Sequence, residues 1–63
     1  MLKDTIKMLA AEKGMTLREL AKVSEVPYTA IREWNSSMPS ALALVKVTTV
    51  LGTTVEKVLE GEK

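Results

Sequence analysis

The sequence predicts an all-α fold, a compact bundle of five short helices. Apolar residues recur at spacings of three and four, capping residues precede several segments, and no segment alternates apolar and polar residues as strands do. The chain has 63 residues, the length of a single small domain, and it contains no cysteine and no histidine. We therefore expect one domain over residues 1–63, stabilised by close helix packing and by a dimer interface.

The first two helices are separated by Gly14. The first helix has an apolar face spaced i, i+4 and i+7: Leu2, Ile6 and Leu9. Lys13 followed by Gly14 is typical of a helix end. Thr16 and Glu19 then fit a capping box, which predicts a second helix. Its buried stripe is Leu17, Leu20 and Ala21.

The third helix is expected after a short break at residues 24–26. Pro27 suits a first helical turn because it has no backbone N–H, and an N–H at that position would lack a helical partner anyway. The buried stripe of this helix is Ala30, Ile31 and Trp34. Residues 35–39 then form a polar loop that ends in proline.

The last two helices follow Ser40, a natural N-cap. The fourth helix covers residues 41–51, and its core face is Ala41, Leu44, Thr48 and Leu51, with Val47 beside it. Gly52 ends it. Thr53 and Glu56 fit a second capping box for a last helix, whose apolar residues are Val55, Val58 and Leu59.

The residue inventory argues against catalysis. Histidine and cysteine, the usual bases, thiol nucleophiles and zinc ligands, are missing, and the glycines are too isolated to form a phosphate-binding loop. We expect no enzyme activity, no cofactor and no metal. No apolar run approaches the length of a membrane span and the N-terminus does not resemble a cleavable signal, so we expect a cytoplasmic protein.

The stretch from Thr16 to Trp34 carries the functional prediction. It contains a capped helix, a break of three residues and then another helix. Two helices joined by such a turn form a helix-turn-helix, whose second helix can lie in the major groove of DNA.

Residues along nearly the whole chain support this interpretation. They are Leu20-Ala21, Val26, Ile31, Pro39-Ser40, Leu44, Leu51-Gly52 and Val55. At this spacing the chain resembles the phage repressor and Cro family, the lambda repressor-like DNA-binding domains. The resemblance implies a sequence-specific transcriptional regulator that binds double-stranded DNA as a homodimer on a palindromic operator.

The resemblance also implies which residues contact DNA. The base-contacting positions are Pro27, Tyr28, Thr29, Arg32 and Glu33. The phosphate-contacting positions are Thr16, Leu17, Arg18, Asn35, Ser36 and Ser37, and Lys22 is expected on the same side. Arg32 has the geometry to bind guanine bidentately, and the Thr29 methyl group suits a thymine methyl. The alternative for Arg32 is a surface ion pair with a nearby acid.

Two departures from the family pattern predict local structure. Glu25 stands where the family turn usually has a left-handed glycine, a conformation that costs a non-glycine residue about 1–2 kcal/mol. The family often joins a helix-one arginine to an acid at the end of helix three. Ala10 and Asn35 stand at those places, so we expect no internal bridge there.

The charge of the motif is balanced. Residues 15–37 carry three cations and three carboxylates, and the whole chain has a net charge of +1. Because phosphate neutralisation supplies most nonspecific affinity for DNA, this balance predicts modest affinity and dependence on dimer avidity. The lysines of the first helix are interpreted as an ordinary solvated face.

Several apolar residues exceed what the core needs. They are Leu42, Val45, Val55, Val58 and Leu59, which we predict as the dimer interface, and the alternative is ordinary surface exposure.

A different function on the same scaffold also stays open: a protein-interaction module of the antirepressor or antitoxin type. The mixed surface from Tyr28 to Glu33 does not decide between DNA and protein as the main partner.

Overall fold

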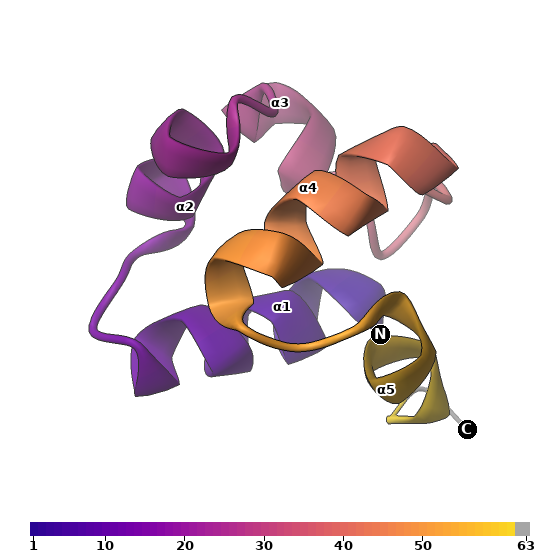
Figure 1. Ribbon diagram of the computed structural model, residues 1–63. Coiled ribbons are helices and arrows are strands. Elements are labelled where there is room, and N and C mark those ends of the chain that lie inside the picture. Colours follow the sequence, from indigo (N-terminus) through magenta and orange to yellow (C-terminus); the bar gives the residue numbers. More distant parts are fainter. Residues whose placement is uncertain (62–63) are drawn as a thin grey trace.

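The computed structural model describes residues 1–61, which fold into five α-helices and no strand. In chain order they are α1 (Leu2–Glu12), α2 (Leu17–Ser24), α3 (Tyr28–Ile31), α4 (Ala41–Leu51) and α5 (Val55–Glu60). In Figure 1, α4 crosses the front of the molecule above α1, with α2 and α3 on one side and α5 near the start of α1. The all-α prediction and the order of five helices are confirmed.

The core takes one fully buried aliphatic side chain from each helix. They are Ile6, Leu20, Ile31, Val47 and Val58. Trp34 is also buried, as its spacing from Ile31 predicts. The aliphatic core therefore holds even the four-residue α3 in place, since so short a helix gains little stability from its own hydrogen bonds.

Two of the predicted helix starts are confirmed and one is shifted. The Thr16 hydroxyl accepts the Glu19 N–H at 3.1 Å while the Glu19 carboxylate accepts the Thr16 N–H at 3.0 Å, a complete capping box. The Ser40 hydroxyl accepts the Ala43 N–H at 3.2 Å. The prediction of a capping box at Thr53 is wrong, because Thr54 is the N-cap of α5 and accepts from Lys57.

Three helices end with a left-handed residue. Beyond α1, α2 and α4 this residue is Gly14, Glu25 and Gly52, with φ of 75°, 59° and 71°. In each case the next N–H reaches back five residues to a helix carbonyl, at 2.9 to 3.1 Å. These hydrogen bonds give a donor to helix carbonyls that would otherwise lack a partner. The predicted left-handed conformation of Glu25 is confirmed, and this is the one non-glycine residue with positive φ among residues 1–61.

After α3 the backbone continues in turns that are tighter than those of an α-helix. The N–H groups of Glu33 and Trp34 bond to carbonyls three residues back, both at 3.1 Å. At three residues per turn, side chains three apart lie on the same side. This places Trp34 directly beyond Ile31, so both are buried.

One predicted core position is wrong in α4. Ala41 is exposed, whereas Leu44, Val47, Thr48 and Leu51 are buried. The first residue of a helix lies at the edge of its packed face, and here that edge is open to solvent.

None of the helices among residues 1–61 has the length and apolar character needed to cross a bilayer.

Candidate nucleic-acid interface

The predicted base-contacting residues form a mostly exposed surface at α3. Thr29 is exposed in the helix, and Arg32 and Glu33 are exposed in the turns that follow it. Pro27 is the exposed N-cap, and its carbonyl accepts the N–H groups of α3's first turn. Tyr28 differs, because it is half-buried against the core. Arg32 forms no ion pair with any carboxylate of residues 1–61, so the interpretation of this residue as a surface ion pair gains no support.

The starts of α2 and α3 are joined by a contact between Arg18 and Tyr28. The Arg18 guanidinium lies over the Tyr28 ring, 4.5 Å from its centroid. Such a cation–π contact contributes about 0.5–1 kcal/mol at an exposed site. It therefore fixes a predicted phosphate contact and a predicted base contact relative to each other.

A groove beside this contact lies between α1 and α2. We call it the α1–α2 groove, and its lining is Lys7, Ala11, Met15, Thr16, Leu17, Arg18 and Tyr28. It contains two cations and no carboxylate. Lys7 is exposed, as expected of the solvated face of the first helix, but its place in this groove was not predicted. No local signal identifies Lys7, because its position beside Arg18 depends on how α1 packs on α2.

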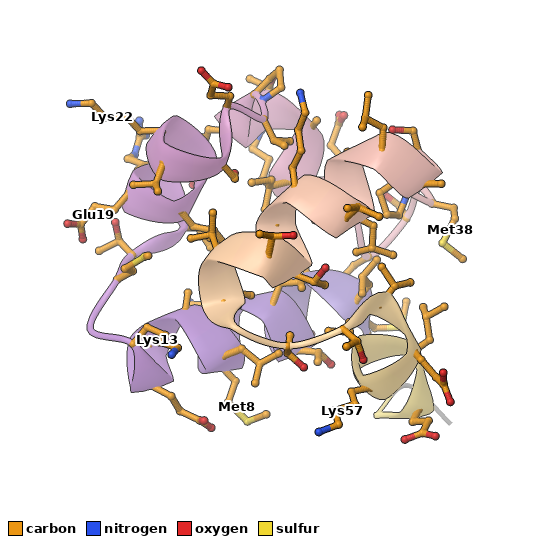
Figure 2. The ribbon with its side chains drawn as sticks, viewed as in Figure 1. Met8, Lys13, Glu19, Lys22, Met38 and Lys57 are labelled. Carbon is orange, nitrogen blue, oxygen red and sulfur yellow. The ribbon has the colours of Figure 1, made fainter. Side chains whose placement is uncertain are left out.

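The other predicted phosphate contacts have different surroundings. Thr16 is exposed, whereas the Leu17 side chain packs partly against the core. Lys22 is exposed on α2, and Figure 2 shows it projecting outward on the side opposite Lys57 of α5. Ser36 and Ser37 are exposed beyond α3. The Ser36 hydroxyl donates to the Glu33 carbonyl at 3.1 Å.

Asn35 is tied to α1 by a link that differs from the arginine–acid bridge of the family and that was not predicted from the sequence. Its side-chain oxygen accepts the Lys3 N–H at 2.9 Å, and its amide nitrogen donates to the Asp4 carboxylate at 3.2 Å. Asn35 therefore satisfies an N–H of the first helical turn and links the segment after α3 to α1. The prediction missed this link because Asp4, rather than Ala10, is the α1 residue that forms it. Both polar atoms of the Asn35 amide are hydrogen-bonded to α1, so its role as a phosphate contact gains no support.

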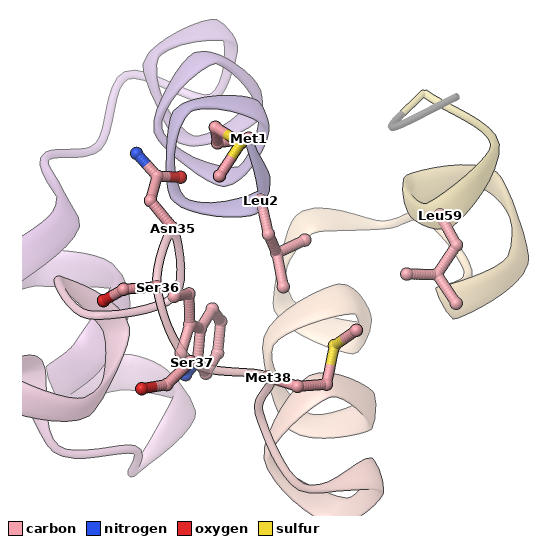
Figure 3. Close-up of a pocket in the computed structure, with 8 residues that line it drawn as sticks. Met1, Leu2, Asn35, Ser36, Ser37, Met38 and Leu59 are labelled. Carbon is pink, nitrogen blue, oxygen red and sulfur yellow. The ribbon is translucent and has the colours of Figure 1, made fainter.

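A second groove is apolar and lies at the start of α1. We call it the Met1–Met38 groove, and its lining is Met1, Leu2, Trp34, Asn35, Ser36, Ser37, Met38 and Leu59. Figure 3 shows Leu2 pointing into the space between the loop that carries Met38 and α5. The Met38 side chain is 80% exposed, so this groove has an unusually open apolar rim.

The predicted dimer-interface residues divide into three groups. Leu42, Val45 and Leu59 are exposed, at 65%, 49% and 41%. Val55 is half-buried against the core. The prediction for Val58 is wrong, because its side chain is only 2% exposed and packs in the core where α5 meets α1 and α4.

No protein-family model, curated protein or solved structure matches this chain. The resemblance to the repressor and Cro family stays a prediction from the residues quoted above. Within residues 1–61, no group of three or more acidic side chains is placed to hold a metal ion.

Proposed function

We propose that this chain is a sequence-specific DNA-binding regulator of the helix-turn-helix type. In this proposal α2 and α3 form the motif, α3 enters the major groove, and Arg32 and Thr29 contact base edges. The observation that carries the proposal is the pairing of α2 and α3. They pack together across a connection of residues 25–27, and the Arg18–Tyr28 contact holds their starts on one surface.

The charge distribution supports the same function better than the net charge does. The protein carries a net charge of only +1. The exposed cations Arg18, Lys22 and Arg32 are matched in number by exposed carboxylates on the same elements, whereas Lys7 and Arg18 line the adjacent groove with no carboxylate. Placement matters more than the total, because phosphates interact with the charges nearest to them when salt screens the rest.

We propose that the chain binds DNA as a homodimer. Its backbone measures 26 × 21 × 18 Å. Recognition helices of a dimer lie about 34 Å apart on a palindrome, one turn of duplex. Two domains of this size, placed side by side, can hold their α3 helices at that spacing. The exposed Leu42, Val45 and Leu59 offer an apolar contact between them.

A second candidate function is a protein-interaction module of the antirepressor or antitoxin type. The Met1–Met38 groove favours it, because flexible methionine side chains suit adaptable binding surfaces. In that case the apolar side, rather than the surface at α3, would carry the function.

The deciding experiment is a selection of duplex fragments by the purified, folded protein, followed by salt titration of the selected duplex. We expect enrichment of a palindromic site whose affinity falls steeply with salt. If the folded protein enriches no duplex at low salt, the proposal fails and the interaction module becomes the better candidate.

A further inference from the structure

The α1–α2 groove stands out from the rest of the molecule in its charge. Lys7 comes from α1 and Arg18 from α2, and no acidic residue lines the groove. Neither cation forms an ion pair with a carboxylate of residues 1–61. Cations and carboxylates are nearly equal in number along the chain, so a groove lined by two cations and no carboxylate is a local exception to that balance.

The Arg18 side chain is held in a form suited to an anion. The central carbon of the guanidinium lies over the Tyr28 ring, 4.5 Å from its centroid. The N–H donors of the guanidinium lie in the plane of the group, so they stay free to bind an oxyanion at its edge. The half-buried Tyr28 ring limits the movement of Arg18, which reduces the entropy lost on binding.

Lys7 adds a second cation from a different helix. It is exposed, and its flexible stem carries three donors on a single charged group. An anion in the α1–α2 groove would therefore meet a fixed fork from Arg18 and an adjustable charge from Lys7. A phosphate group, which has several acceptor oxygens, can bind both at once.

We propose that Lys7 and Arg18 together bind one backbone phosphate of duplex DNA in the α1–α2 groove. This rests on the proposed function and extends it, because α1 then contacts DNA together with α2 and α3. It also offers a role for the Arg18–Tyr28 contact, which would position a phosphate contact against the start of the base-reading helix.

The test compares the salt dependence of duplex binding for Lys7→Gln with that of Lys57→Gln. Both lysines are exposed, and both substitutions remove one positive charge. Lys57 lies on α5 and projects to the side of the molecule opposite Lys22 (Figure 2). We expect Lys7→Gln to reduce the slope of log K against log salt by about 0.9, the value for one phosphate contact. Lys57→Gln should leave the slope unchanged, and circular dichroism should show both variants folded.

A double-mutant cycle with Arg18→Gln tests whether the two cations share a phosphate. Side chains that hold the same group are coupled, so the double variant should lose less affinity than the product of the two single losses. Independent losses would mean that the two cations bind separate phosphates and would overturn the shared site.

The outcomes separate this inference from the proposed function. If the wild type binds no duplex, the proposed function itself fails. If the wild type binds duplex but Lys7→Gln and Lys57→Gln have equal slopes, only the role of Lys7 is overturned. Saturable binding of inorganic phosphate that Lys7→Gln abolishes, with no change in the duplex slope, would assign the groove to a free anion and also overturn the proposal.

Discussion

Two sides of this molecule are built in different ways. On the side of α2 and α3, a complete capping box, a left-handed turn and the Arg18–Tyr28 contact fix polar and charged groups in defined positions. At the start of α1, the Met1–Met38 groove presents flexible apolar side chains, with Met38 80% exposed. Fixed donors suit a rigid polar ligand, whereas flexible apolar side chains suit a partner surface of adaptable shape. The contrast fits the two functions proposed above, with DNA binding on one side and protein binding on the other.

Trp34 lies between these sides, and its removal should have the largest effect. Trp34 is buried and lines both the Met1–Met38 groove and the neighbouring hollow beside α3. We expect Trp34→Ala to lower the free energy of unfolding by about 3–5 kcal/mol, which approaches the whole stability of so small a domain. Urea unfolding followed by circular dichroism measures this. The exposed Met38→Ala serves as the control and should change stability by less than about 0.5 kcal/mol.

Arg32→Ala should impair only the DNA binding proposed for the side of α2 and α3. We expect it to reduce discrimination between the selected duplex and a random one by about 1–3 kcal/mol, because the proposed bidentate contact with guanine would be lost. Lys22→Ala should instead weaken binding to both duplexes by the same factor and reduce the slope of log K against log salt. Binding titrations with the two duplexes measure both effects. An equal loss on both duplexes for Arg32→Ala would rule out base reading by this residue.

Charges at the exposed residues of the predicted dimer interface should separate the proposed dimer without unfolding the chain. We expect Leu42→Asp with Leu59→Asp to raise the dimer dissociation constant at least tenfold, about 1.4 kcal/mol, because carboxylates would be buried in the interface. Sedimentation velocity measures the association. Leu42→Asp alone is compared with Met8→Asp, since each adds one carboxylate at an exposed apolar residue and Met8, 56% exposed, is not among the predicted interface residues. If both variants associate equally, this surface is not the interface.

Asn35→Ala tests the link between the segment after α3 and α1. It leaves the Lys3 N–H without its acceptor and Asp4 without its donor. We expect a loss of about 1 kcal/mol in unfolding free energy, the usual effect of removing a helix cap. Ser36→Ala removes a neighbouring exposed hydroxyl and should cost less than about 0.5 kcal/mol. Equal unfolding midpoints for the two variants in urea would show that the link adds no stability.

Glu25→Gly should have the smallest effect, and it should be stabilising. The left-handed conformation at φ 59° strains a residue with a Cβ, while glycine adopts it freely but loses more chain entropy on folding. We expect a net gain of about 0.5–1 kcal/mol. Glu25→Ala keeps the Cβ and should not stabilise the protein. Thermal unfolding compares the two variants, and an equal gain from Glu25→Ala would mean that the carboxylate, rather than the backbone, causes the strain.

Local features of the sequence were sufficient to predict the order of the helices and several of their ends, but not the end of α3 before Trp34 or the start of α5. The capping box of Thr16 and Glu19, the Ser40 cap and the left-handed Glu25 all depend on groups within a few residues of each other. Hydrogen bonds and dihedral limits at this range are encoded in neighbouring residues. The shift from Thr53 to Thr54 shows the limit of such patterns, because two adjacent threonines offer two starts and the pattern does not choose between them.

The tertiary structure alone decided how the helix faces are used. Val58 is buried while Leu59 is exposed, although both are apolar neighbours on one short helix. Asn35 turns its amide toward α1, and Lys7 lies in the same groove as Arg18. Each outcome depends on where α1 docks against residues far away in the chain. Residue identity and helical period determine which side chains share a face, but only packing determines what that face meets.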